Sequence, residues 1–385
     1  MSYRLTIVIE ALDRGGAEWH LLQVLPRLLG HNFEVEVFCL HHRGELAAEM
    51  QRRGILVHGS DVPQSSLLVR IGHLLVRAVM LFFHLLRRKP EIVHFFLPAA
   101  YILGAPASVL ARSRIRLMSR RSQNRYQKQM FWSGFIERQW HHRMSAVLGN
   151  SQNVIEQLSE EGVPKSKLYL VYNGVDLSAF GRQIPQQVAR DRLGLSGEAL
   201  VFVIVANLIP YKGHADLLQA FAKIKEHLPQ NWALLCAGRD DGIGSLLQDM
   251  VEELGLTQRV HWLGSVKDVP SLLAAADIAL LTSHEEGFSN ALIEYMATGL
   301  PTVATDVGGN PEAVLNEQTG IIVPAHNPAA LADAILRLAL DPSLRQKFGT
   351  AAQLLVRERY SLEACVENYV ELYRKILEEH GLKVG

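Results

Sequence analysis

Two glutamates near residue 290 stand at a spacing that suits ligand binding. Glu286 and Glu294 lie just over two helical turns apart, so a residue ahead of a helix and one inside it can share a face. The pattern SNALIEYMATG predicts a helix that begins between them. Free backbone N–H groups and the helix dipole favour an anion at such a start, typically a phosphate. The stretch indicates an anion site flanked by two carboxylates able to bind sugar hydroxyls; a capped helix with an ordinary surface glutamate pair is the alternative.

Three other sets of residues could contact such an anion. Lys212 lies in a loop directly ahead of a predicted helix, where its ammonium can meet a phosphate held by backbone N–H groups. Gly15 and Gly16 follow the first predicted strand and lack a Cβ, so their backbone can approach a ligand closely. Arg120 and Arg121 stand at the end of a predicted strand, where open α/β sheets bind ligands. A solvated lysine and a surface arginine pair are the alternatives.

The elements that position these residues alternate between apolar strand patterns and helical patterns. This alternation predicts an α/β fold with doubly wound parallel sheets and right-handed crossovers. The chain length of 385 residues favours two domains. The predicted strands of the first series span 4–10, 34–40, 55–58, 91–97, 115–119, 146–151 and 167–174, and a second series begins at 199–208.

One long apolar stretch covers residues 67–89. Arg70, His73, Arg77 and His84 interrupt it at near-helical spacing. Since a membrane span needs about 20 predominantly apolar residues, the stretch predicts an amphipathic crossover helix packed on a sheet. Partial contact with lipid is the alternative.

The charges are unevenly distributed along a chain that is neutral overall. Residues 1–180 hold 22 basic and 14 acidic residues, and residues 61–143 alone hold 14 basic and 3 acidic ones. This basic block indicates a patch that meets an anionic partner or a membrane surface, and a solvated basic surface is the alternative. No recognised nucleic-acid-binding module surrounds its aromatic residues, so nucleic acid is not an expected partner.

The cysteines and the N-terminus bear on location. Cys39, Cys236 and Cys365 are far apart and odd in number, which indicates neither a disulfide framework nor a zinc spacing and favours a reducing compartment. The first residues predict a strand and a loop rather than a signal peptide. We therefore expect a cytoplasmic protein, with the inner face of a membrane as a further hypothesis.

The stretch EGFSNALIEYMATGLPTVATDVGGNPE (286–312) resembles the E-x7-E region of retaining GT-B glycosyltransferases, most closely the large family 4 (glycosyl transferases group 1). The resemblance continues through TGIIVP and the helix after it, and GGAE, NLIPYKGH and HWLGSV are similar to further family segments. It covers nearly the whole chain, most densely residues 199–360.

The resemblance implies two Rossmann-like domains facing a cleft. The first would be an acceptor-side domain at 1–180, completed by a C-terminal helix at 361–385, and the second a nucleotide-sugar-binding domain at 199–360. We expect the polar stretch 177–198 to form a linker.

The resemblance also implies roles for individual residues. Glu286 would face the donor sugar, Glu294 would hold the nucleotide ribose, and Lys212 would hold the diphosphate. Candidate catalytic residues are Glu286, Lys212, Arg120 and Arg121. The implied donor-binding set is Gly15, Gly16, Asn207, Lys212, Leu263, Gly264, Glu286, Gly287, Phe288, Ser289, Asn290, Ala291 and Glu294.

Two positions depart from the family pattern. Asn207 stands where the family has an arginine that also holds the diphosphate. Arg120 and Arg121, in the segment SRRS, stand where the family often has a histidine that touches the transferred sugar. We expect one of the two arginines to contact the acceptor or the donor phosphate.

The implied reaction is a metal-independent retaining transfer from a nucleoside diphosphate sugar, of the UDP or GDP type, to a sugar or lipid-linked acceptor such as a cell-surface glycan precursor. No D-x-D or other dense acidic motif occurs, so neither a metal nor another cofactor is expected. A nucleotide-sugar epimerase and a catalytically inactive nucleotide-sugar- or lipid-binding protein are the alternatives. The joint presence of Glu286, Glu294 and Lys212 argues against the inactive protein.

Overall fold

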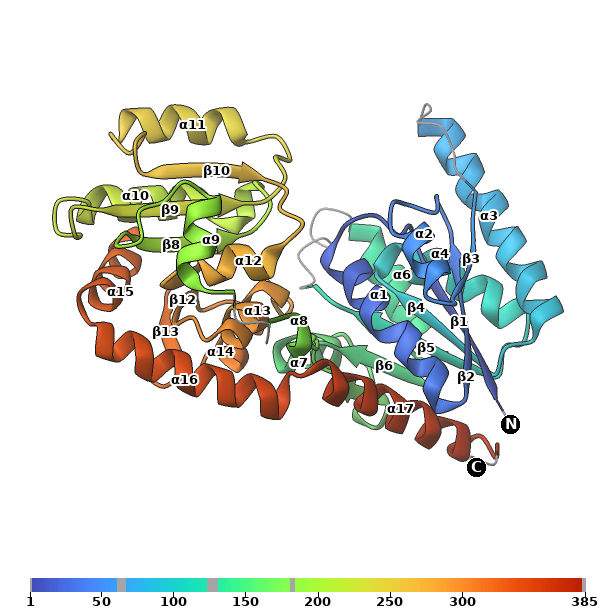
Figure 1. Ribbon diagram of the computed structural model, residues 1–385. Helices are drawn as coiled ribbons and strands as arrows, with labels where there is room; N and C mark the ends of the chain where they lie inside the picture. Colours follow the sequence, from blue (N-terminus) through green and yellow to red (C-terminus); the bar gives the residue numbers. More distant parts are fainter. Residues whose placement is uncertain (1, 61–66, 123–130, 181–183, 383–385) are drawn as a thin grey trace. The chain divides into compact units, whose positions relative to one another are not determined.

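The computed structural model describes residues 2–60, 67–122, 131–180 and 184–382 (Figure 1). The chain divides into two compact units. Unit 1 comprises Met1–Gly174 and Leu362–Gly385, and unit 2 comprises Val175–Ser361. Each unit is built on a parallel sheet, so the predicted α/β class with two Rossmann-like domains is confirmed.

Unit 1 has a sheet in the order β3-β2-β1-β4-β5-β6-β7, with every pairing parallel. Its central strands are buried on both faces because helices cover each side, as Ile7 and Val8 of β1 illustrate. The strands are β1 (Tyr3–Ile9), β2 (Phe33–Cys39), β3 (Leu56–His58), β4 (Ile92–Phe96), β5 (Ile115–Arg120), β6 (Ala146–Gly149) and β7 (Leu168–Leu170).

The described helices of unit 1 include one that returns from the far end of the chain. The apolar side of this last helix, α17, is buried in the unit 1 core. The helices are α1 (Gly16–Leu28), η1 (Leu29–His31), α2 (Ala47–Arg52), α3 (Leu67–Arg88), α4 (Pro98–Leu110), α6 (Phe131–His141), α7 (Gln152–Glu160), η2 (Lys165–Lys167) and α17 (Leu362–Glu379).

Unit 2 repeats the plan with a sheet in the order β10-β9-β8-β11-β12-β13, again parallel throughout. The strand order reverses between β8 and β11, and such a switch point is where open α/β sheets bind ligands at the carboxyl ends of their strands. The strands are β8 (Leu200–Val205), β9 (Trp232–Ala237), β10 (Val260–Gly264), β11 (Ile278–Leu281), β12 (Thr302–Thr305) and β13 (Gly320–Val323).

The helices of unit 2 flank this sheet. They are α8 (Leu177–Phe180), α9 (Gln186–Arg192), η3 (Pro210–Lys212), α10 (His214–Ile224), α11 (Gly244–Glu253), α12 (Val269–Ala274), α13 (Asn290–Thr298), α14 (Asn310–Ala313), α15 (Pro328–Leu340) and α16 (Pro342–Arg359).

The prediction of a linker at 177–198 was wrong for the described residues. Helices α8 and α9 lie in this stretch, and both belong to unit 2. Arg190 of α9 is buried, with its guanidinium bonded to the Ala275 carbonyl and 2.8 Å from Asp277 Oδ2. The stretch is polar because its side chains bond to distant parts of the unit. Its composition alone therefore resembled that of a linker.

The stretch 67–89 forms a single helix, α3, as its pattern predicted. Leu81 and Leu85 face the core, and Arg77 is buried with a hydrogen bond to the Cys39 carbonyl. Within the parts of the chain that the structure describes, no helix has the length and apolarity of a membrane span. The described outer side of α3 carries the exposed apolar residues Leu75, Val76, Val79, Met80, Phe83 and Leu86.

Candidate functional site

The loop after β8 is held against the loop after β11, and this contact positions Lys212. Gly213 has a φ of +70°, and a Cβ on it would lie 1.9 Å from the Thr282 carbonyl oxygen. The Thr282 hydroxyl donates to the carbonyls of Lys212 and Gly213, each at 3.1 Å. Glycine is therefore required where the two backbones touch.

Lys212 and Glu286 meet at the switch point of the unit 2 sheet. Lys212 Nζ lies 2.6 Å from Glu286 Oε1, which also accepts a hydrogen bond from the Ser283 hydroxyl at 2.7 Å. The two charged side chains are 19% and 10% exposed. Burial alone would lower the pKa of Lys212, but the charge and hydrogen bond of Glu286 outweigh burial and raise this pKa. The lysine is therefore a fixed cation at the carboxyl edge of the unit 2 sheet.

The helix α13 begins directly beside this pair. Its N-cap residue, Ser289, makes no side-chain capping bond. The Gly287 carbonyl accepts a hydrogen bond from the Gly309 N–H at 2.8 Å, and the Phe288 ring packs against Tyr360. Since the Phe288 side chain is buried in the unit, a ligand at this loop would meet backbone rather than the ring. These two contacts hold the loop in place, and a fixed loop suits an anion site at a helix start.

Glu294 lies inside α13, and its environment differs from that of Glu286. Its carboxylate makes no hydrogen bond to any described residue, and its pKa is raised to about 7 because burial disfavours the charged form. The next residue, Tyr295, is fully buried and accepts a hydrogen bond from the Val205 N–H at 2.7 Å, which fixes α13 against β8. The backbone that carries Glu294 is thus fixed, and its carboxylate is left without a hydrogen-bond partner among the described residues.

Asn207 has a neighbour that the sequence analysis missed. Its side-chain oxygen accepts a hydrogen bond from the Arg239 N–H at 3.1 Å, and its amide donates to Asp241. Arg239 follows β9, is largely exposed, and pairs with Asp241 at 2.6 Å. An arginine therefore stands next to the position where the family arginine is replaced. Only the pairing of β8 with β9 reveals this, because the two residues are 32 positions apart.

Leu263 and Gly264 end β10, at the carboxyl edge of the same sheet. Gly264 is exposed with a φ of +61°, and its carbonyl accepts a hydrogen bond from the Gly238 N–H at 2.8 Å. The strand register shifts at this point. The backbone here turns away from the sheet, which leaves its edge accessible.

In unit 1, Gly15 and Gly16 start α1 after β1. Gly15 is the N-cap of α1 and is exposed, as is Gly16. Glu18 of the first turn folds over Gly15. Burial raises the pKa of the Glu18 carboxyl, while the nearby charge of Arg121 acts to lower it. Arg121 is half-buried and its guanidinium donates hydrogen bonds to Asn173 and Tyr369.

The expectation for Arg120 needs correction. Its side chain is fully buried, and its guanidinium contacts Glu137 and, at 2.6 Å, Glu161 Oε1. The cation is enclosed by carboxylates inside unit 1, so it does not point to a substrate. Of the arginine pair, only Arg121 keeps an accessible position.

The structure brings Lys212, Glu286 and the start of α13 together, with Asn207, Leu263 and Gly264 on the same sheet edge of unit 2. Gly15, Gly16 and Arg121 belong to unit 1. That both sets contact one substrate stays a prediction.

Comparison with known proteins gives a consistent result. Residues 185–355 match the family Glycosyl transferases group 1, and residues 14–179 match Glycosyltransferase Family 4. The chain is 30% identical over 233 residues to N-acetyl-alpha-D-glucosaminyl L-malate synthase of Bacillus anthracis, covering 60% of each protein. It is 34% identical to D-inositol 3-phosphate glycosyltransferase of Corynebacterium urealyticum, covering 56% of this chain and 54% of that one. The matched part thus spans little more than half the length of these relatives.

The fold comparison covers more of the chain. The crystal structure of HepE from Anabaena superposes with a TM-score of 0.84 at 22% identity, covering 97% of this chain and all of that one. Two parallel-sheet units, both family matches and this superposition agree, and we conclude that the chain belongs to the group 1 glycosyltransferases of the GT-B fold.

Proposed function

We propose that the chain transfers a sugar from a nucleoside diphosphate sugar to an acceptor, with retention of configuration and without a metal. The observation that carries the proposal is the Lys212–Glu286 pair, 2.6 Å apart beside the start of α13. A cation and a helix start suit the diphosphate, and a carboxylate suits the hydroxyls of the sugar.

Each residue has a distinct task in this proposal. Lys212 and the backbone N–H groups at the start of α13 bind the diphosphate and stabilise the charge that develops on it as the bond to the sugar breaks. Glu286 binds hydroxyls of the sugar, which gains positive character in that step. Glu294 accepts hydrogen bonds from the ribose. A phosphate oxygen of the donor takes the proton of the acceptor hydroxyl, so no protein nucleophile is assigned.

The donor class is supported by a relative. HepE has been solved with UDP and with UDP-glucose, and its fold matches this chain. The uracil and guanine nucleotides are therefore the first to compare. We propose that the backbone at Leu263 and Gly264 contacts the nucleobase, because both residues end β10 at the accessible sheet edge.

A thermal-shift panel with UDP, GDP, ADP and their sugars tests donor binding, since a specific ligand raises the melting temperature by mass action. We expect one nucleotide base to dominate, and a chain that responds to none of them would contradict the proposal. Incubation of the stabilising sugar nucleotide without an acceptor then identifies an epimerase by its epimer. Binding without turnover, with any acceptor class, would identify an inactive binding protein.

For the acceptor we propose a lipid-linked glycan precursor at the inner face of a membrane. The exposed apolar side of α3 ends in Arg87, Arg88 and Lys89, all exposed. An apolar stripe with adjacent cations suits an anionic lipid surface. Cosedimentation with anionic vesicles should fall as salt rises, because surface charges are screened within roughly 8 Å at physiological salt.

The test variant is Phe83→Ser, which interrupts the apolar stripe without changing the charge and should reduce cosedimentation. Equal pelleting with neutral vesicles, or none with either kind, would argue against the membrane contact. This result would leave the donor-binding proposal in place, because the donor panel uses soluble nucleotides only.

A further inference from the structure

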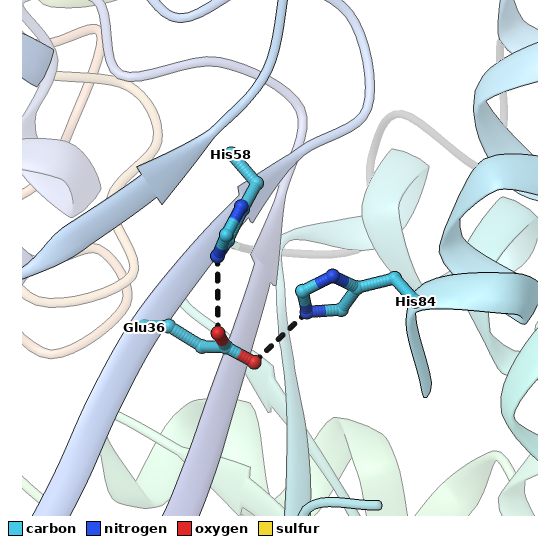
Figure 2. A group of neighbouring side chains, drawn as sticks. All are labelled: Glu36, His58 and His84. Carbon is cyan, nitrogen blue, oxygen red and sulfur yellow. Dashed lines mark hydrogen bonds and ion pairs between the residues drawn. The ribbon is translucent and has the colours of Figure 1, made fainter. Parts of the chain in front are cut away.

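A carboxylate and two imidazoles converge in unit 1, and none of them belongs to the set assigned to the donor (Figure 2). Glu36 comes from β2, His58 from β3 and His84 from α3. Glu36 Oε2 lies 3.0 Å from His58 Nε2, and Glu36 Oε1 lies 2.8 Å from His84 Nε2. Figure 2 shows both rings directing their Nε2 edges at the same carboxylate.

Two imidazole nitrogens and one carboxylate oxygen are the ligand set of open zinc sites. Bonds of about 2.1 Å in a tetrahedral site place neighbouring ligand atoms about 3.4 Å apart. The 3.0 and 2.8 Å contacts join the two imidazoles to different oxygens of the Glu36 carboxylate, and one ligand atom from each of the three residues lies within 4.8 Å of the others. An ion at this place therefore requires rotation of the two rings towards one carboxylate oxygen, and a water molecule or an anion would complete the fourth position.

The carboxylate is held by a further partner, as metal-ligating carboxylates are. The Thr6 hydroxyl donates to Glu36 Oε1 at 2.8 Å, and the register of β1 and β2 places the two residues opposite each other. Glu36 is thus held in place by a partner on the neighbouring strand.

Arg88 occupies part of the space around this anion. Its Nε lies 3.2 Å from Glu36 Oε2, and its side chain is 43% exposed. His58 is 38% exposed, whereas Glu36 and His84 are 6% and 13% exposed. The site is therefore open to solvent on one side, and Arg88 can leave when a dication enters.

Two other groups of potential ligands are less suitable. Glu137, His141 and Glu161 are buried around the Arg120 guanidinium, which already supplies the cation. Asp216, His284 and His326 lie in unit 2 and also bring their ligand atoms within 4.8 Å of one another, but none of the three is buried and His326 is exposed, whereas Glu36 is buried.

We propose that Glu36, His58 and His84 bind one divalent transition-metal ion of the Zn²⁺ class, which clips α3 to β2 and β3. The proposal goes beyond sugar transfer and does not depend on it. The metal-independent reaction proposed above concerns Lys212 and Glu286 in unit 2, whereas this site belongs to unit 1.

Titration calorimetry of the EDTA-treated full chain with ZnCl₂ tests the site. We expect one ion bound in the wild type, with a rise of about 5 °C in the melting temperature at a hundredfold excess over the dissociation constant. Glu36→Gln and His58→Ala should each weaken binding at least tenfold. Arg88→Gln should strengthen it, because the competing cation is gone. Substitution by Co²⁺ should give the visible absorption of a tetrahedral site.

Matched controls come from histidines elsewhere in the chain. His227→Ala removes an exposed imidazole of unit 2, and His326→Ala removes one ligand of the Asp216 group, so both should bind Zn²⁺ as the wild type does. His58 is partly exposed, so its variant reports on binding even where Glu36→Gln fails to fold. Absence of Zn²⁺ binding by the wild type, or equal binding by the wild type and His58→Ala, would overturn the proposal.

Discussion

Two cations of this chain, Lys212 in unit 2 and Arg120 in unit 1, lie near the carboxyl ends of parallel strands but have opposite surroundings. Lys212 is partly exposed and pairs with one carboxylate, Glu286, at a helix start. Arg120 is fully buried and contacts two carboxylates, Glu137 and Glu161. The difference teaches that strand-end position alone does not identify a substrate cation. What matters is whether the protein already surrounds the charge.

The largest expected effect is on the stability of the protein, through the buried Arg120. Arg120→Met leaves Glu137 and Glu161 without their cation inside the unit, and breaking a buried pair in this way costs about 3–5 kcal/mol of the free energy of unfolding. Denaturant titration measures it. Arg121→Met is the matched control, and it should affect turnover more than stability. An Arg120→Met protein of normal stability and lost turnover would reverse the assignment.

The next effect concerns Glu286, whose carboxylate faces the reacting sugar in our proposal. Glu286→Gln should lower kcat by about 100-fold while raising KM much less, because the charge matters most in the transition state. Steady-state kinetics with the donor measures both constants. Glu285→Gln, in the same loop, is the control and should stay near wild type. A change in KM alone would remove Glu286 from the reacting centre.

Lys212 gives a binding effect of intermediate size. A charge-assisted contact to phosphate contributes about 1.5–3 kcal/mol, so Lys212→Ala should weaken nucleoside diphosphate binding by one to two orders of magnitude. Binding of the bare nucleoside should hardly change. Calorimetry compares the two ligands, with Lys223→Ala on the exposed side of α10 as the control. If both ligands weaken alike, the phosphate contact is wrong.

Arg239 sharpens the comparison further, because it is an exposed cation with one carboxylate partner beside Asn207. We expect it to supply part of the charge that the family arginine would supply. Arg239→Gln should weaken diphosphate binding by about threefold to tenfold, less than Lys212→Ala does, because an exposed side chain is well solvated. An additive effect in the double variant would place both cations at the phosphates independently.

The smallest effect is a pH dependence at Glu294, whose pKa is raised to about 7. The folded state holds this proton more tightly than the unfolded state does, so the group's contribution to stability is present at low pH and is lost as pH rises through about 7. Donor KM should fall over the same range, because the ionised carboxylate is the better acceptor. Glu294→Gln should remove both trends and leave kcat nearly unchanged; a persisting KM trend would exclude Glu294 as its source.

Local patterns in the sequence predicted most of the strands and helices, and they predicted the part of the candidate site around Glu286 and Glu294. Apolar runs such as residues 4–10 and 199–208 predicted strands because a strand buried on both faces excludes polar side chains. The pattern SNALIEYMATG predicted that α13 begins between Glu286 and Glu294, and helix geometry is set over a few residues. These inferences needed no partner from elsewhere in the chain.

The tertiary structure decided which distant residues meet. Arg120 is enclosed by Glu137 and Glu161. Arg239 lies beside Asn207 because β8 pairs with β9. Helix α9 is held by an ion pair to Asp277, which directly precedes β11. Glu36, His58 and His84 are separated by more than twenty residues at each step, so no sequence motif marks them. Strand register and helix packing bring them within hydrogen-bonding distance, and register is set by the burial of whole faces rather than by any local pattern.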